Sequence, residues 1–275
     1  MQIGIDISTL VNHGQDIGAG RYIYNLVENL LEIDNVNSYL LTGRYLNNDY
    51  LGIARELTAG YPDSKVRLKL YPVTQKKLKY WNLFRFPPYE FLGTRTEVMH
   101  FPDFLVSPTL NRNIVLTIND LAFVRFPEFN FGWFIKKYTK EVKKNARRAR
   151  KIIAISESTK KDIVNFFSVN PAKIEVIYPA AGKIFRKLKK EDIDKSIPDK
   201  YNTGKKYILS VGTIEPRKNY VALIEAYNAL REEYDTDIRL IIVGRTGWKS
   251  EATYQKRDDS PYREDILFLG RVEDR

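Results

Sequence analysis

Residues 207–219 read YILSVGTIEPRKN and begin a strand–helix–strand pattern. An apolar strand is predicted over 207–211, a glycine turn follows it, and a helix is predicted over 218–233. Apolar residues recur in that helix every three or four positions, which is typical of a helix with one buried face. They are Tyr220, Leu223, Ile224, Tyr227 and Leu230. Because another strand is predicted over 238–243, this unit predicts a parallel sheet.

The same alternation of strands and helices fills the sequence before this stretch. Strands are predicted over 2–7, 38–41, 65–70, 98–101, 114–118, 152–155 and 174–177, and helices over 20–34, 131–151 and 158–167. A last strand is predicted over 266–269. Strands as continuously apolar as 114–118 fit a parallel sheet that is covered on both faces.

The pattern divides the chain into two α/β domains. We predict a first Rossmann-like domain over 1–181, a basic linker over 182–205, and a second domain over 206–275. The second domain has only about three predicted strands, whereas doubly wound sheets usually have five or six. We therefore expect the second domain to be incomplete.

Composition excludes several classes of chemistry. The chain has 275 residues, no cysteine and only two histidines, so disulfides, thiolate catalysis and cysteine-bound metals are excluded. The net charge of +11 predicts an anionic partner such as a sugar nucleotide, an acidic lipid or a nucleic acid. There is no signal-peptide pattern and no apolar run of about 20 residues, so a cytoplasmic location is predicted.

A glycine-containing turn precedes the first predicted helix. It contains Gly18, Ala19, Gly20 and Arg21. Glycines at the start of a helix allow backbone N–H groups to approach a phosphate. The alternative is an ordinary tight turn between a strand and a helix, and this motif alone leaves both interpretations open.

The cations Arg217 and Lys218 follow the strand 207–211. Such a pair suits a diphosphate, since arginine can bind in two-pronged fashion and lysine adds a point charge. The alternative is a pair of solvated cations at the start of the predicted helix. That alternative is weakened because basic residues oppose the helix dipole at an N-terminus.

Asn119 and Asp120 follow the strand 114–118. Ligands of open α/β sheets bind at the carboxyl ends of strands, so Asp120 is a candidate to hydrogen-bond a sugar or to act on a hydroxyl. The alternative is that Asp120 serves as a turn or cap residue.

Taken together, the motifs resemble the retaining GT-B glycosyltransferases of family 4. The resemblance lies in 18–22, 98–102, 117–121, 153–159, 176–179, 211–219, 243–244, 247–248 and 268–272, which have the family's order and spacing along the whole chain. It implies two Rossmann-like domains that face each other across a cleft.

The resemblance also implies roles for particular residues. Arg217 and Lys218 would grip the diphosphate of the donor, and Gly18 and its neighbours would face it from the other domain. Gly212 and Gly244 would belong to the donor site, and Arg271 and Val272 would lie near the base. The implied reaction transfers a hexose from a UDP- or GDP-sugar to a glycan or a lipid-linked acceptor. It retains the anomeric configuration and needs no metal or other cofactor.

The chain departs from the family pattern in two places. The family usually has histidine before the aspartate at 120, and here that residue is Asn119, which cannot serve as a charged acid or base. The family's Glu-x7-Glu segment should follow Val272 by some tens of residues, beyond the end of this chain. We therefore expect weak donor binding and little turnover from the chain as it stands.

Two basic–aromatic segments predict contact with an anionic membrane. One is the helix 132–151, which contains nine Lys and Arg residues and one acidic residue. The other contains Lys76, Lys77, Lys79, Tyr80, Trp81, Phe84, Arg85 and Phe86. Docking on anionic lipid and plain solvated surface are both open interpretations.

Three other functions are compatible with part of this sequence. A nucleotide-sugar epimerase has the same architecture, but the segment 215–219 argues against it. A nucleic-acid-binding protein is suggested only by charge, and no known binding module is recognised, so nucleic acid is not an expected partner. A non-catalytic remnant or sugar-nucleotide-binding module remains the alternative.

Overall fold

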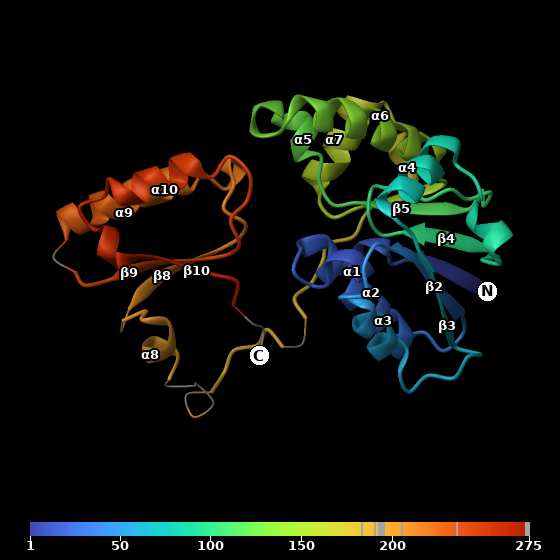
Figure 1. Cartoon of the computed structure of the whole chain (residues 1–275), viewed down its shortest axis with the longest axis horizontal. Helices are drawn as coiled ribbons and strands as arrows, with labels where there is room; N and C mark the ends of the chain where they lie inside the picture. The colour runs from blue at the N-terminus through green and yellow to red at the C-terminus, as the bar shows by residue number, and fades with distance from the viewer. Residues whose placement is uncertain (183, 190, 192–195, 205, 235, 273–275) are drawn as a thin grey trace. The chain divides into compact units, whose positions relative to one another are not determined.

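The computed structural model describes residues 1–182, 184–189, 191, 196–204, 206–234 and 236–272. The chain forms two compact units, Met1–Gly182 and Lys183–Arg275 (Figure 1). The stretch predicted as a linker, 182–205, contains the short helix α8 (Ile197–Tyr201), and the rest of it lies partly outside the described residues. Over the described residues, no helix has the length and apolar character needed to cross a membrane.

Unit 1 is built on a seven-stranded parallel sheet of order β3-β2-β1-β4-β5-β6-β7. The strands are β1 (Gln2–Asp6), β2 (Ser38–Tyr45), β3 (Val66–Pro72), β4 (Val98–Phe101), β5 (Ile114–Ile118), β6 (Lys151–Ala154) and β7 (Ile174–Val176). All neighbouring pairs are parallel, as the alternation of strands and helices predicts. Each strand coincides with a predicted one to within a few residues.

Helices cover this sheet in two groups. The first group is α1 (Ser8–His13), α2 (Gly18–Ile33) and α3 (Leu51–Thr58), and Figure 1 shows it beside β1–β3. The second is α4 (Gln75–Phe84), α5 (Ala122–Arg125), α6 (Gly132–Arg148) and α7 (Glu157–Phe167). Short 3₁₀ turns η1 (Tyr89–Leu92), η2 (Pro127–Phe129) and η3 (Pro171–Lys173) complete the connections.

The core of unit 1 has two apolar clusters. One joins β1–β3 to α1–α3 and includes Ile5, Ile23 and Leu41. The other joins β4–β7 to the later helices and includes Phe101, Leu116 and Ile152. The two clusters belong to adjoining halves of the sheet, because the chain builds the sheet outward from β1 in one direction and then returns to build it from β4 in the other.

Unit 2 has a three-stranded parallel sheet of order β10-β9-β8 within the residues described. Its strands are β8 (Tyr207–Val211), β9 (Arg239–Val243) and β10 (Ile266–Gly270), and its longer helices are α9 (Tyr220–Glu233) and α10 (Glu251–Asp258). The turns η5 (Pro216–Lys218) and η6 (Arg263–Asp265) precede α9 and β10. Ile224, Tyr227 and Leu240 lie in the core between α9 and the sheet.

Three sequence predictions were wrong in detail. The helix predicted over 131–151 ends at Arg148, because Lys151 already belongs to β6. The helix predicted over 218–233 begins at Tyr220, because Asn219 adopts a left-handed conformation (φ 51°) that separates it from the preceding turn. Trp81, predicted in a basic–aromatic surface segment, is only 7% exposed because it lies on the inner face of α4.

Candidate functional site

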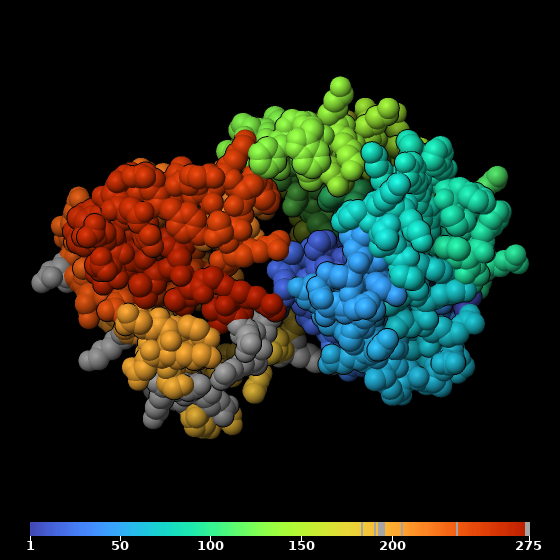
Figure 2. All heavy atoms as spheres, in the orientation of Figure 1, coloured from blue at the N-terminus to red at the C-terminus, as the bar shows by residue number. Residues whose placement is uncertain are grey.

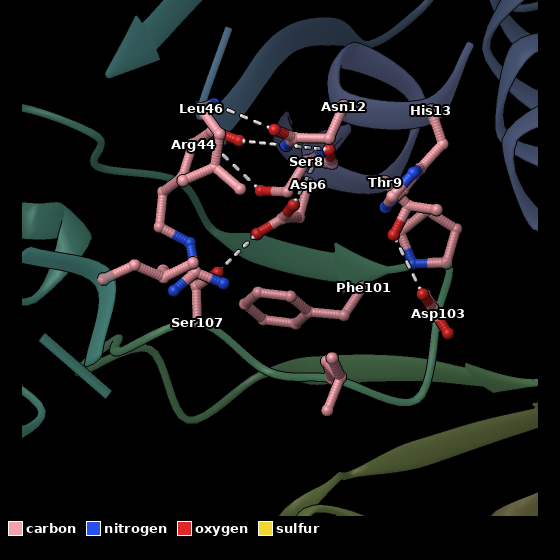
Figure 3. A pocket seen from close by; sticks show the side chains of 13 residues that line it. Asp6, Ser8, Thr9, Asn12, His13, Arg44, Leu46, Phe101, Asp103 and Ser107 are labelled. Carbon is pink, nitrogen blue, oxygen red and sulfur yellow. Dashed lines mark hydrogen bonds between the residues drawn. The ribbon is translucent and has the colours of Figure 1, made fainter. Parts of the chain in front are cut away.

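A pocket of about 170 Å³ lies in unit 1 at the carboxyl ends of β1, β2 and β4 (Figure 3). Its lining comprises Asp6, Ser8, Thr9, Asn12, His13, Arg44, Leu46, Leu78, Phe101, Pro102, Asp103, Leu105 and Ser107. This volume is below the roughly 300–1,000 Å³ of pockets that enclose a whole small-molecule ligand. The pocket therefore suits one part of a larger ligand.

The topology of the sheet explains why a pocket forms there. From β1 the chain passes to β2 and β3 on one side, and then to β4 and onward on the other side. The connections after β1 and β4 therefore leave the sheet in opposite directions, which opens a crevice at their carboxyl ends. Asp6 ends β1, Arg44 lies near the end of β2, and Asp103 follows β4.

Asp6 joins the walls of the pocket. One carboxylate oxygen, Oδ1, accepts a hydrogen bond from the backbone N–H of Ser8 (2.8 Å). The other, Oδ2, accepts from the hydroxyls of Tyr89 (2.9 Å) and Ser107 (2.7 Å). Burial, and then the nearby Asp6 carboxylate, raise the pKa of the Tyr89 hydroxyl, so Tyr89 remains a donor. The carboxylate of Asp6 thus accepts three hydrogen bonds from within unit 1, and these bonds hold the walls of the pocket together.

Asn12 fastens helix α1 to the end of β2. Its amide Nδ2 donates to the backbone carbonyls of Ser8 and Arg44, each at 2.6 Å, and its Oδ1 accepts from the backbone of Leu46 (2.9 Å). The hydroxyl of Ser8 accepts from the backbone N–H of Arg44 (3.0 Å). These bonds, visible in Figure 3, fix one wall of the pocket.

The Arg44 side chain connects the pocket to helix α4. Its Nη1 donates to Oδ1 of Asn82 (2.8 Å), and its guanidinium lies 5.4 Å from the centre of the Trp81 ring. Such a cation–π contact and a hydrogen bond together hold a long side chain in one orientation. Arg44 is therefore a fixed positive group at the pocket.

Asp103 and His13 supply the groups that suit a polar ligand. Oδ2 of Asp103 accepts from the hydroxyl of Thr9 (2.8 Å), and Oδ1 accepts from the backbone of Phe104 (2.7 Å). Burial raises the pKa of the Asp103 carboxyl in spite of these bonds. His13 ends α1 and is exposed beside them. Carboxylate, hydroxyl, imidazole and guanidinium groups together can bind the hydroxyls of a sugar.

In unit 2, the predicted cations lie in the turn η5. Nη2 of Arg217 lies 2.6 Å from Oε1 of Glu215, whose side chain is 3% exposed, whereas the Arg217 side chain is 37% exposed. The buried carboxylate thus fixes the guanidinium while part of it still faces solvent. Lys218 is exposed beside it. The pair lies in η5 and precedes α9 instead of opening it, so these cations do not occupy the N-terminal turn of α9 that the sequence predicted.

The predicted glycines of unit 2 meet at the carboxyl edge of its sheet. The N–H of Gly212 donates to the carbonyl of Val243, and the N–H of Gly244 donates to the carbonyl of Gly270, both at 2.8 Å. A Cβ atom at Gly244 would overlap the carbonyl oxygen of Gly212. Close backbone packing therefore requires Gly244. Arg271 and Val272 follow β10 at the same edge.

The two glycines of the predicted phosphate turn differ in surroundings. A Cβ atom at Gly20 would overlap the carbonyl oxygen of Gly14, so packing within unit 1 requires this glycine. A Cβ atom at Gly18 would have no neighbour within 4 Å. Ala19 and Arg21 lie with them in the first turn of α2. The role of this turn in phosphate binding stays a prediction.

Asn119 and Asp120 do not line the pocket. Oδ1 of Asp120 accepts from the backbone N–H of Ala122 two residues on (3.0 Å), which is the turn role that the sequence left as an alternative. The backbone carbonyl of Asn119 accepts from the hydroxyl of Thr159 (3.2 Å). A role for their free polar atoms in catalysis stays a prediction.

Sequence reasoning missed the residues of the pocket itself. Asp6, Arg44 and Asp103 are also polar residues at or just after strand ends, the signal used for Asp120. Polar residues follow many of the strands, so this signal alone does not show which strand ends lie together. The order of the strands in the sheet is needed for that. Over the described part of the chain, no group of three or more His, Asp or Glu side chains is arranged to hold a metal ion.

Comparison with known proteins identifies the family. The model for Glycosyltransferase Family 4 matches residues 17–181, more than half of the chain, and the model for Glycosyl transferases group 1 matches residues 192–275. The crystal structure of Anabaena HepE in complex with UDP and glucose superposes with a TM-score of 0.65 at 12% identity, covering 100% of this chain and 70% of that one.

Two curated relatives are similar in sequence. The O-antigen chain mannosyltransferase B of Escherichia coli is 27% identical over 186 residues, 64% of this chain and 46% of its own. The N-acetylgalactosamine-N,N'-diacetylbacillosaminyl-diphospho-undecaprenol 4-alpha-N-acetylgalactosaminyltransferase of Campylobacter jejuni is 28% identical over 220 residues, 78% of this chain and 55% of its own. The chain thus spans about half the length of these relatives. The expected α/β fold of GT-B type, with a short second sheet, is confirmed, and the chain belongs to Glycosyltransferase Family 4.

Proposed function

We propose that this chain is the part of a hexosyltransferase that binds a UDP- or GDP-sugar and an acceptor glycan or lipid-linked glycan. The observation that carries the donor half of this proposal is the fixed Arg217 guanidinium beside the exposed Lys218 in η5. Glu215 orients the arginine without covering it. Two cations held at the carboxyl edge of a parallel sheet suit a diphosphate.

The acceptor is proposed to enter the pocket of unit 1. Asp103, Thr9 and His13 offer acceptors and donors for sugar hydroxyls, and Arg44 adds a fixed positive group. The small volume suits one sugar ring or part of one, with the remainder of the acceptor outside. Gly18, Ala19, Gly20 and Arg21 remain proposed phosphate contacts, and Asn119 and Asp120 proposed sugar contacts.

The proposed reaction breaks the bond between the anomeric carbon of the donor sugar and its phosphate oxygen. A bond forms between that carbon and an acceptor hydroxyl oxygen, on the same face, so that configuration is retained. The hydroxyl proton passes to an oxygen of the departing nucleoside diphosphate. Arg217 and Lys218 stabilise the negative charge that develops on this diphosphate. Two cations supply the neutralisation that a metal would otherwise give, so no metal is part of this proposal.

The printed names of similar proteins support the substrate classes. HepE was crystallised with UDP and glucose, and also with UDP-glucose. The Campylobacter relative is named for an acceptor on diphospho-undecaprenol, and the Escherichia relative is named a mannosyltransferase. With a lipid-linked acceptor, the proposed location is the cytoplasm at the inner face of the cell membrane.

Nucleotide binding by the chain itself tests the donor half. We expect UDP or GDP to bind, measured by isothermal titration calorimetry, and Lys218→Met to weaken that binding by about tenfold or more through loss of a charged hydrogen bond. Arg217→Lys should also weaken it, because lysine keeps the charge beside Glu215 but loses the two-pronged contact. The control is Arg263→Met, which removes an exposed cation at the opposite edge of the same sheet.

Equal affinity for wild type and Lys218→Met would contradict the proposed donor site. Where transfer is observed, NMR of the product at the anomeric position tests retention, and an inverted linkage would contradict it. Unchanged turnover in EDTA is expected.

A further inference from the structure

A group of large apolar side chains is exposed where helix α4 ends in unit 1. Leu83, Phe84 and Phe86 are 67%, 69% and 61% exposed, Phe91 in η1 is 65% exposed, and Tyr80 is 47% exposed. We call these five residues the α4 patch. Scattered apolar residues are normal on a protein surface, but a contiguous group marks an interaction site.

Four members of the α4 patch form two contacting ring pairs. The rings of Tyr80 and Phe84, one helical turn apart, stack with their centres 6.2 Å apart and an interplanar angle of 12°. The rings of Phe86 and Phe91 meet edge to face at 5.7 Å. Figure 2 shows the α4 segment, coloured cyan, at the surface of unit 1. The patch therefore presents packed aromatic pairs to solvent.

The opposite face of α4 is firmly attached to the core. Trp81 is buried, its Nε1 donates to the carbonyl of Pro87 (2.6 Å), and its ring meets that of Tyr89 edge to face at 5.9 Å. Thr74 caps the helix by accepting from the backbone N–H of Lys77 (3.2 Å). The exposed side chains are thus presented by an ordered element whose own apolar face is already satisfied.

The charges on helix α4 itself all have one sign. Helix α4 contains three exposed lysines, Lys76, Lys77 and Lys79, and no acidic residue. Arg85 follows α4. Burial and then the Arg85 charge lower the pKa of Arg148 at the end of α6, and Glu90 of η1 acts in the opposite direction. A patch of aromatic rings beside three exposed lysines is complementary to a surface that is apolar inside and negative outside.

We propose that the α4 patch inserts into the headgroup region of an anionic lipid bilayer. Aromatic and leucine side chains enter the boundary between headgroups and acyl chains, and the lysines contact the acidic headgroups. The ten residues of α4 are too few to span a bilayer, so the helix lies along its surface. A soluble protein partner would be expected to offer carboxylates and an apolar groove together, and it is the alternative outcome of the test.

Docking through α4 has a consequence for the pocket. Leu78 of the same helix lines the pocket, and Asn82 and Trp81 hold the Arg44 side chain. The pocket therefore lies directly behind the element that contacts the bilayer, where the head of a lipid-linked acceptor would be found. This consequence rests on the proposed function, whereas the docking surface itself does not.

Co-sedimentation of the 275-residue chain with lipid vesicles tests the proposal. We expect binding to vesicles of phosphatidylcholine with about 30% phosphatidylglycerol, loss of binding to pure phosphatidylcholine, and weakening by salt. Replacing Leu83 and Phe84 by serine should weaken binding at least tenfold. Replacing Lys76, Lys77 and Lys79 by alanine should weaken it on the order of a hundredfold, since each cation near such a surface contributes about fivefold.

Two controls make the outcome specific. Ile33→Ser with Val36→Ser removes equally exposed apolar residues elsewhere on unit 1, and Trp133→Ser removes the exposed tryptophan of the basic helix α6. Both should leave vesicle binding unchanged. Wild-type binding by Leu83→Ser/Phe84→Ser overturns the proposal, and so does a dimer in solution that this double substitution dissociates. Nucleotide affinity, measured on the same variants, is expected to stay unchanged and separates this proposal from the donor site.

Discussion

The guanidinium of Arg217 lies 2.6 Å from the carboxylate of Glu215, and only the arginine of this pair is substantially exposed. A nearly buried carboxylate is costly to keep charged unless a cation remains beside it. The ion pair thus stabilises the turn η5. It also holds the Arg217 guanidinium at the edge of the sheet. Structural and ligand-binding roles of Arg217 are separable by experiment.

Removing only the arginine should be worse for stability than removing both charges. We expect Arg217→Met to lower the free energy of unfolding of unit 2 by about 2 kcal/mol, because Glu215 is left buried without its cation. The double variant Glu215→Gln/Arg217→Met should recover much of this loss. Pulse proteolysis in urea, in which the cleavage products of unit 2 are quantified, measures this free energy of unfolding. Lys218→Met is the matched control and should leave the stability of unit 2 unchanged. An equal loss of stability in Arg217→Met and Lys218→Met would contradict a specific role for the Glu215–Arg217 pair.

Two glycines offer a second contrast. We expect Gly244→Ala to destabilise unit 2 by about 2 kcal/mol or more, because the new methyl group overlaps the backbone of Gly212. Gly18→Ala has open space around it and should leave the stability of unit 1 unchanged or slightly higher. If Gly18 contacts a phosphate, Gly18→Ala will lower nucleotide affinity without lowering stability. Unchanged affinity would remove Gly18 from the proposed donor contacts.

A buried histidine predicts the response of unit 1 to acid. His100 lies in β4, its Nε2 is 2.9 Å from the hydroxyl of Thr117, and burial lowers its pKa from 6.5 to about 4. As pH falls from 6.5 to 4, the unfolded chain binds a proton at this histidine and the folded chain does not. Stability should therefore fall over this window, by on the order of 3 kcal/mol in total. His100→Asn should show a flatter dependence in urea unfolding at pH 7, 6, 5 and 4; identical slopes would contradict this.

The sheet of unit 1 was predictable because its strands are short apolar runs that stand apart from the more polar sequence around them. Helix α1 was missed because its six residues bury only Leu10 and Val11, too few to display a period. Helix α10 was missed because Thr253 is its only buried residue in the described structure. In both cases, tertiary packing stabilises a helix whose sequence carries no strong signal of its own.

The sequence predicted more residues of the proposed donor site than of the proposed acceptor pocket. Gly212, Arg217 and Lys218 lie within one local strand–turn pattern, and residue type alone made the two cations candidates. Gly244 follows the next strand, β9, and was assigned only through the family resemblance. The pocket of unit 1 instead combines Asp6, Arg44 and Asp103 from three strands. Only the strand order brings β2, β1 and β4 together, and polar residues at strand ends do not encode that order.

The contact between Arg44 and α4 predicts that this helix depends on the pocket for its stability. Arg44→Met removes the hydrogen bond to Asn82 and the charge over the Trp81 ring, while methionine keeps an apolar side chain against the ring. We expect faster hydrogen exchange in α4 and η1, corresponding to a loss of about 1–2 kcal/mol in local stability.

Arg55→Met, on the exposed side of α3, is the control and should leave hydrogen exchange in α4 unchanged. Asn82→Ala should reproduce part of the effect, because it removes the hydrogen bond and keeps the cation–π contact. If exchange in α4 were the same in Arg44→Met and wild type, the arginine would not couple the pocket to the helix, and the patch and the pocket would act independently.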